Sequence, residues 1–202
     1  MPPPDELPRF AAADLRRFFT AVDAHLPTPA TITVIGGSAI ALYGVSSGTT
    51  DIDTLDTTLA PLQAAIDQAR VVTSLNIPVV PAPVADVPYH SEDRLQPELG
   101  PWTRLTVLKL EPHDLALSKA VRGFENDFAA IEALHQIIPL NLDTLVTRYL
   151  DEMGQAIGDP AQQDVKFALM IERLYGDAEA ERVEARIRSH RKRRKQSPPH
   201  RS

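Results

Sequence analysis

The segment from Val34 to Asp53, with the sequence VIGGSAIALYGVSSGTTDID, most constrains what this chain can fold into. The preceding residues Thr31 to Ile35 form a β-branched run, which predicts a short buried strand. The Gly36-Gly37 pair then allows a tight turn, and Ser38 is expected to cap a short helix. A loop leads from that helix to a second strand, so the segment predicts a small mixed α/β unit.

The second strand carries two carboxylates. Asp51 and Asp53 are two positions apart, so in a strand they lie on one face while Ile52 points into the core. Neighbouring carboxylates repel each other unless a cation lies between them, and Mg²⁺ commonly binds such a pair together with water and substrate phosphates. The helix start after the glycines offers unpaired backbone N–H groups to a phosphate. Either motif alone is more often an ordinary turn or a solvated strand edge, but their combination predicts a metal and triphosphate site.

This combination resembles the polymerase-β-like nucleotidyltransferase superfamily. A second stretch, from Glu92 to Leu134, contains EDRLQP and LTVLKLEPHDLALSKAVRGFENDFAAIEAL and resembles the DUF6036 nucleotidyltransferases, relatives of abortive-infection and type IV toxin–antitoxin toxins. The resemblance implies an enzyme that uses Mg²⁺ and an NTP to transfer a nucleoside monophosphate to RNA, such as tRNA, or to a protein hydroxyl. It also implies a toxin in a toxin–antitoxin or phage-defence system, with a cognate antitoxin as a possible partner.

The same resemblance implies roles for three residues on two successive helices. Lys119 is expected to reach the triphosphate, with Arg122 and Asp127 supporting the site. From spacing alone, Lys119 and Arg122 share one helical face and could clamp an anion, although a solvated helix face is the simpler alternative. The predicted catalytic residues are Asp51, Asp53 and Lys119, the metal ligands are Asp51 and Asp53, and the nucleotide contacts are Gly36, Gly37, Ser38, Thr49, Lys119 and Arg122.

Two departures from the family pattern favour an alternative function. Related sequences carry an arginine four residues before the first aspartate, where this chain has Ser47, followed by Thr49 and Thr50. A third carboxylate is expected on a later strand, but residues 76–80 supply none. The candidates that follow are Asp86, Glu92 and Asp93. The alternative is therefore a catalytically degenerate protein that binds nucleotides or nucleic acid.

The predicted fold class is α+β, with a mixed sheet followed by a helical lobe. We expect a nucleotidyltransferase core over residues 1–110, a helical lobe over 111–188 and a disordered basic tail over 189–202. Pro112 suits a helix start, Gly123 a helix end and Asp159-Pro160 a further capped start. The only tryptophan, Trp102, is expected to pack on the core rather than to stack on a base.

The charge distribution separates the end of the chain from the rest. The net charge is −6, yet residues 182–202 hold nine of the 21 Lys and Arg residues and a single acid. Such a segment could bind RNA phosphates, keep the protein in solution, neutralise the acidic surface of the rest of the chain or receive an acidic antitoxin. These four alternatives remain open at the level of sequence.

Composition restricts the remaining classes. The chain has no cysteine, which excludes disulfides, a thiol nucleophile and thiolate zinc sites, and its six histidines are scattered. No apolar run approaches the roughly 20 residues that a membrane-spanning helix needs, and the first residues lack the pattern of a signal peptide. We therefore expect a cytoplasmic protein without a membrane partner.

Overall fold

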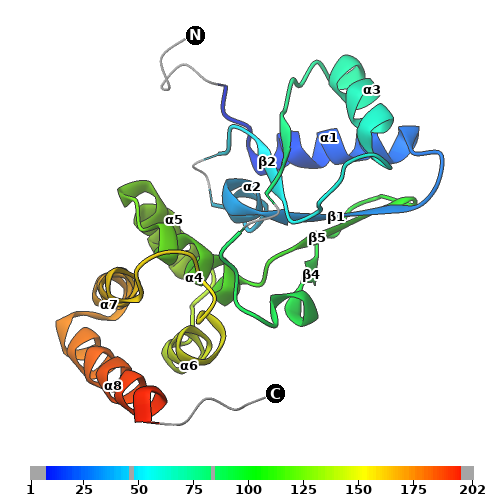
Figure 1. Ribbon diagram of the computed structural model, residues 1–202. Helices are drawn as coiled ribbons and strands as arrows, with labels where there is room; N and C mark the ends of the chain where they lie inside the picture. Colours follow the sequence, from blue (N-terminus) through cyan, green and yellow to red (C-terminus); the bar gives the residue numbers. More distant parts are fainter. Residues whose placement is uncertain (1–7, 46–47, 83–84, 197–202) are drawn as a thin grey trace. The chain divides into compact units, whose positions relative to one another are not determined.

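The computed structural model describes residues 8–45, 48–82 and 85–196 and divides the chain into two compact units (Figure 1). The sheet unit comprises Met1–Ala85 and His90–Leu115, and the helical unit comprises Asp86–Tyr89 and Ala116–Ser202. The division falls within helix α4, Pro112–Arg122. Ser47, where related sequences carry an arginine, lies outside the described residues.

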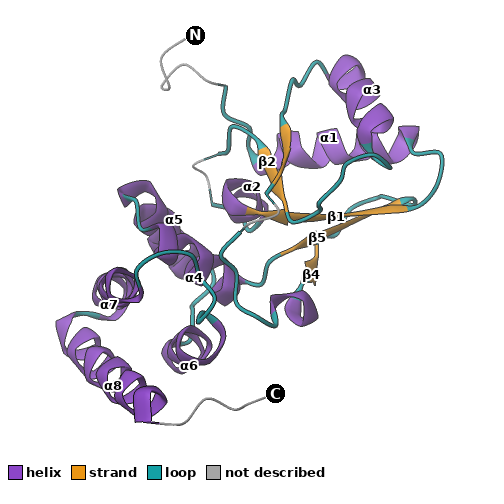
Figure 2. Cartoon of the chain, in the orientation of Figure 1, coloured by secondary structure: helices purple, strands orange, loops and turns teal. Residues whose placement is uncertain are grey.

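The sheet unit contains one mixed sheet with the strand order β3-β2-β1-β5-β4 (Figure 2). The central pair, β1 and β5, is parallel, and β2 joins β1 in the antiparallel direction. The predicted α+β class is therefore confirmed. The strands are β1 Ala30–Ile35, β2 Ile52–Thr54, β3 Val79–Pro81, β4 Gln96–Pro97 and β5 Leu105–Lys109, and the helices are α1 Ala12–His25, α2 Gly36–Leu42, α3 Gln63–Thr73 and the 3-10 helix η2 Ser91–Arg94.

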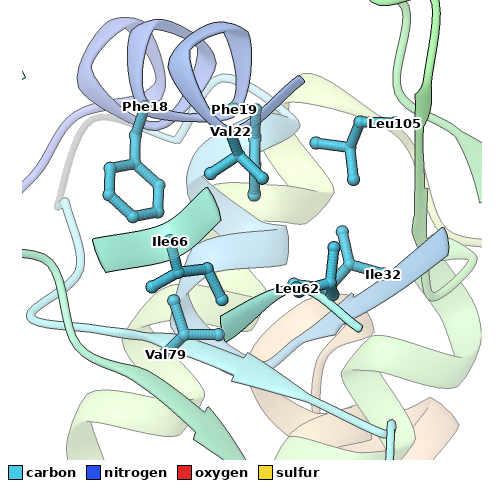
Figure 3. A pocket seen from close by; sticks show the side chains of 8 residues that line it. All are labelled: Phe18, Phe19, Val22, Ile32, Leu62, Ile66, Val79 and Leu105. Carbon is cyan, nitrogen blue, oxygen red and sulfur yellow. The ribbon is translucent and has the colours of Figure 1, made fainter. Parts of the chain in front are cut away.

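Helices α1 and α3 pack on one face of this sheet. Apolar residues of α1 and of the start of α3 meet one residue each of β1, β3 and β5, and together they line an apolar cavity of about 10 Å³ (Figure 3). A cavity of this size and lining stays dry. Its lining residues are Phe18, Phe19, Val22, Ile32, Leu62, Ile66, Val79 and Leu105.

Strand register places Asp53 on the opposite face. Residues that face each other in paired strands share one side of the sheet, and the sides alternate along each strand. Ile32 lines the cavity, so Ile35 lies on the other face, and Asp53 of β2 is paired with Ile35. Thr31 and Thr106, a pair on that same face, are exposed.

Asp23 fixes the start of β5 against the end of α1. Its carboxylate accepts hydrogen bonds from the backbone N–H groups of Thr103, Arg104 and Leu105 at 2.9, 2.6 and 2.7 Å. Trp102, just before these donors, packs edge-on against Phe19 with ring centroids 5.8 Å apart. The expectation that Trp102 packs on the core is therefore confirmed.

The two outer strands of the sheet each end in a proline. On β3, the N–H of Ala82 donates to the backbone oxygen of Thr54 on the neighbouring strand. The backbone nitrogen of the preceding residue, Pro81, therefore points away from the sheet. On β4, the N–H of Glu98 bonds to β5, so Pro97 faces outward in the same way. Each proline removes a hydrogen-bond donor from the edge of the sheet.

The helical unit contains the rest of α4 and the helices α5 Glu125–Ile137, α6 Leu142–Glu152, α7 Pro160–Tyr175 and α8 Asp177–Gln196. Asn141 caps α6 by accepting from the N–H of Thr144 at 2.9 Å, and Asp159 caps α7 in front of Pro160, as predicted. Apolar residues at helical spacing form the core. They include Leu117, Phe128, Ile131, Leu145, Tyr149, Phe167, Ile171, Val183 and Ile187.

The basic end of the chain is helical for longer than expected. Residues 189–196, predicted to belong to a disordered tail, continue α8 as far as Gln196, while residues 197–202 lie outside the described part. Arg191 bonds to Asp164 of α7 at 2.8 Å, and the hydroxyl of Tyr149 donates to the same carboxylate at 2.6 Å. This arginine therefore neutralises an acidic residue of the helical unit. Among the described residues, no helix combines the length and apolar character needed to cross a bilayer.

Candidate nucleotide site

The Gly36 turn brings the backbone directly against a carboxylate. Gly36 has a φ of +62°, a left-handed conformation that favours glycine. A Cβ atom at this position would lie 2.5 Å from Oδ2 of Asp53, so no other residue fits without displacing the carboxylate. The turn and Asp53 are therefore built as one structure, although the two residues lie on different elements.

Gly37 leaves room for the loop that carries Asp51. A Cβ atom at Gly37 would lie 2.9 Å from the hydroxyl oxygen of Thr49. That hydroxyl donates to the backbone oxygen of Asp51 at 3.0 Å and lies 3.4 Å from its Oδ1. Thr49 is itself fixed by two backbone hydrogen bonds with Phe10. Thr49 therefore holds Asp51 beside the glycine turn.

The predicted alternation of the aspartate strand is present. Ile52 is fully buried, whereas Asp51 and Asp53 are both half-buried. The sheet unit thus brings together five of the predicted site residues, which are Gly36, Gly37, Thr49, Asp51 and Asp53.

Ser38 has a different role from the one predicted. The helix begins at Gly36 with Ile35 as its N-cap residue, so Ser38 is not the cap, and that prediction is wrong. The left-handed turn at Gly36 starts the helix earlier than the sequence pattern suggests. The Ser38 side chain is fully buried, and its hydroxyl donates to the backbone oxygen of Ile35 at 2.9 Å.

The helical unit holds the other predicted cluster. Lys119 and Arg122 of α4 both donate to Oδ1 of Asp127, the third residue of α5, at 3.0 and 2.6 Å. Lys119 and Asp127 are buried, while half of the Arg122 side chain is exposed. The second oxygen of Asp127, Oδ2, is buried and has no hydrogen-bond partner among the described residues. The residues are therefore together, but the cations are bound to the protein's own carboxylate.

A comparison with known protein families identifies the family of this chain. Residues 13–175 match the family described as "Nucleotidyltransferase of unknown function (DUF6036)". The chain belongs to the DUF6036 nucleotidyltransferases. Searches of curated proteins and of solved structures returned no match.

The third carboxylate that many nucleotidyltransferases carry is not supplied by β3. Register places Val80 opposite Asp53 on that strand. Of the three candidates, Asp86 lies in the helical unit and accepts from the N–H of Ile157 at 2.8 Å. Glu92 and Asp93 lie with His90 at the exposed η2 turn, the one group of three potential ligand residues that the described part of the chain brings within 4.8 Å. Within the described residues of the sheet unit, no third carboxylate or histidine therefore joins Asp51 and Asp53.

Sequence reasoning missed a buried network at the other end of α2. The hydroxyl of Tyr43 donates to the backbone oxygen of Leu110 at 2.8 Å, and the ammonium of Lys109 lies 4.4 Å from the centre of the Tyr43 ring. Lys109 also pairs with Glu98, which accepts from Arg16 of α1 at 2.7 Å. Burial and the nearby carboxylates raise the pKa of Tyr43.

Lys166 was also missed. Its ammonium donates to the backbone oxygens of Val121 and Arg122 at 2.9 Å, and its side chain fills the space beside Gly123, whose φ is +65°. Lys166 lies on α7, far along the chain from the α4 end that it caps. No local pattern signals such a contact, because it depends on how α7 packs.

Proposed function

We propose that this DUF6036 protein transfers a nucleoside monophosphate from an NTP to an acceptor hydroxyl. The observation that supports this most strongly is the fit between the Gly36 turn and the carboxylate of Asp53, where a Cβ atom would lie 2.5 Å from Oδ2. A solvated strand edge needs no such fit. Thr49 donates to the backbone oxygen of Asp51 beside the same turn, so contacts within the protein position this aspartate before any ligand arrives.

The donor set suits a divalent cation. Asp51 and Asp53 provide carboxylate oxygens, and Mg²⁺ is commonly held by one or two carboxylates while water and substrate phosphates complete its shell. A cation bound there would polarise the α-phosphoryl group and favour ionisation of the acceptor hydroxyl. We propose Asp51 and Asp53 as its ligands.

The transfer balances without a further reactant. The acceptor oxygen forms a bond to the α-phosphorus, the bond from that phosphorus to the bridging oxygen of the β-phosphate breaks, and pyrophosphate leaves. The proton of the acceptor hydroxyl passes to solvent. Lys119 and Arg122 would offset the charge of the triphosphate, and Asp127 would orient Lys119, to which it is bonded at 3.0 Å. Backbone groups of Gly36, Gly37 and Ser38 would contact the phosphates.

The test is direct. Purified protein is incubated with Mg²⁺, each α-labelled NTP and a mixture of cellular RNA and protein. Wild type should transfer label, Asp53→Asn should not, and the matched variant Asp67→Asn, at an exposed position on α3, should behave as wild type. Label on RNA or on protein would identify the acceptor class. Full transfer by a folded Asp53→Asn variant would refute the site.

The proposed biological role is that of a toxin in a toxin–antitoxin or phage-defence system, and it rests on the resemblance of residues 92–134 to such toxins. Induction of wild type in cells should then arrest growth, and induction of Asp53→Asn at equal abundance should not. Equal growth of both strains would remove the toxin role without affecting the transfer reaction. An antitoxin would be sought as a protein that relieves the arrest.

Two observations favour a second candidate function, namely Val80 on β3 and Ser47 in place of the arginine that related sequences carry. Because β3 places an apolar side chain opposite Asp53, the chain could be a degenerate member that binds nucleotides or nucleic acid without turnover. This candidate predicts NTP binding by calorimetry with no transfer of label to any acceptor. Any transfer that depends on Asp53 rejects it.

A further inference from the structure

Phe124 is unlike every other phenylalanine in the chain. The other five, Phe10, Phe18, Phe19, Phe128 and Phe167, are at most 6% exposed, whereas Phe124 is 70% exposed. Burial therefore explains five of the six phenylalanine rings but not this one. Phe124 also stands between Arg122 and Asp127, two of the residues in the buried ion-pair cluster.

The backbone at this ring is firmly held. Phe124 is the N-cap residue of α5 and has an extended conformation, with φ −78° and ψ 156°. Its backbone oxygen accepts from the N–H groups of Asp127 and Phe128 at 2.9 and 3.2 Å. On the other side, Lys166 holds the end of α4 through two backbone oxygens. Such a ring is presented to a ligand with little loss of conformational entropy.

The charged residues next to Phe124 in the sequence suit a phosphate. Arg122 is half-exposed and donates to Asp127 through one nitrogen, so much of its guanidinium still faces solvent. Asp127 is neutralised by both Lys119 and Arg122, and the neighbouring Glu125 is held by Arg173 at 2.7 Å.

We infer that Phe124 is a stacking platform for a nucleobase whose phosphate is bound by Arg122. The inference rests on the proposed function, because it assigns part of a nucleotide to the same cluster. The base belongs to the incoming NTP or to an unpaired nucleotide of an RNA acceptor, two sources with the same chemistry. Stacking on one aromatic ring tolerates every base, so the platform supplies affinity rather than base selection.

The experiment compares three ligands that differ in whether they carry a base. The full chain is titrated by calorimetry with a non-hydrolysable α,β-methylene NTP, a short single-stranded oligoribonucleotide and inorganic tripolyphosphate. Phe124→Ala should weaken binding of at least one base-containing ligand by about 5- to 100-fold and leave tripolyphosphate binding unchanged. Phe124→Tyr, which keeps the ring, should bind as wild type, and Arg122→Gln should weaken binding of all ligands that bind at the cluster.

The control is Val165→Ala, which removes an apolar side chain that is 69% exposed on α7. It should bind all ligands as wild type, and thermal unfolding should show that both alanine variants are folded. If Phe124→Ala weakens binding of the NTP analogue alone, the platform belongs to the substrate site. If it weakens binding of the oligonucleotide alone, the platform belongs to the acceptor site.

Three results would overturn the inference. These are no binding of either base-containing ligand by wild type, unchanged binding by Phe124→Ala, and a loss that is equal for tripolyphosphate. The proposed function fails separately. If Asp53→Asn abolishes transfer while Phe124→Ala binds normally, only the platform is wrong. If wild type transfers no label, the function fails, and the three titrations still decide the platform.

Discussion

The sheet unit and the helical unit hold their candidate residues in different ways. In the sheet unit, the backbone sets the site, because Gly36 leaves room for Asp53 and Thr49 fixes Asp51. In the helical unit, side-chain charges set it, because Lys119 and Arg122 converge on one oxygen of Asp127. Substitutions should therefore act through steric fit in the first unit and through unpaired charge in the second.

The largest effect on stability is expected at Asp127. In Asp127→Ala, Lys119 remains buried without its carboxylate, which should lower the free energy of unfolding by about 3 kcal/mol. Urea unfolding followed by circular dichroism at 222 nm measures the loss. The control is Glu125→Ala, whose side chain is 74% exposed, so the loss of its solvent-screened ion pair should lower stability far less. Equal losses for the two variants would show that burial does not set the strength of this cluster.

The largest effect on transfer activity is expected from a substitution in the glycine turn. Gly36→Ala places a Cβ atom 2.5 Å from Asp53 and should lower transfer activity by about 100-fold through displacement of the carboxylate. Gly44→Ala is the matched control, because Gly44 also has a positive φ, of +97°, but no atom of the described residues, apart from its own chain neighbours, lies within 4 Å of its Cβ position. Both variants should lose similar stability, and only Gly36→Ala should lose activity. Equal activity would contradict the steric argument.

Substitution of Asp23 should lower stability by a smaller amount, and only in the sheet unit. Asp23→Ala removes the acceptor of three backbone N–H groups at the start of β5, so we expect a loss of about 2 kcal/mol. Emission from Trp102, the only tryptophan, reports on this unit alone. Asp67→Ala on the surface of α3 is the control and should leave the Trp102 transition unchanged.

Asp23 also gives the sheet unit a dependence on pH. Burial tends to raise the pKa of Asp23, but the hydrogen bonds from Leu105, Arg104 and Thr103 together lower it below its usual value. The folded state therefore binds this proton less readily than the unfolded state. Its stabilisation is complete above the ordinary aspartate range and is lost as the pH falls through the folded pKa. Asp23→Ala should remove that part of the acid sensitivity.

The smallest effect on stability is expected from His135 in the helical unit, near neutral pH. Burial lowers the pKa of His135, and its Nδ1 accepts from the N–H of Leu140 at 3.0 Å. The unfolded state therefore takes up a proton first, and stability should decline as the pH falls through 6.5, the ordinary value, toward the folded pKa. His135→Gln should flatten the decline measured at 222 nm between pH 7.5 and 5.5. A parallel decline in His135→Gln would exclude this residue as the cause.

The sequence was most informative where the contacting residues are close along the chain. The strand, glycine turn and aspartate pair could be predicted because their pattern depends on local backbone geometry. The same holds for the Asp159 cap of α7. The roles of Lys119 and Asp127 remain a prediction from resemblance, since their spacing alone also suits a solvated helix face.

The parts that could not be predicted depend on packing between distant segments. Lys166 reaches α4 from α7, and Asp23 binds backbone donors about 80 residues away. Arg191 meets Asp164 only because α8 packs on α7, which also explains why the basic segment stays helical to Gln196. The local sequence around these residues does not indicate which distant residues they contact.

The prolines at the ends of the two outer strands limit how another molecule can bind to the sheet. Pro81 and Pro97 each interrupt the row of donors that an added strand would need. An extended peptide therefore finds no continuous ladder at either outer strand. A partner that bound the sheet unit would therefore be recognised by side chains rather than by strand addition at these two edges, and single substitutions could then separate one partner from another.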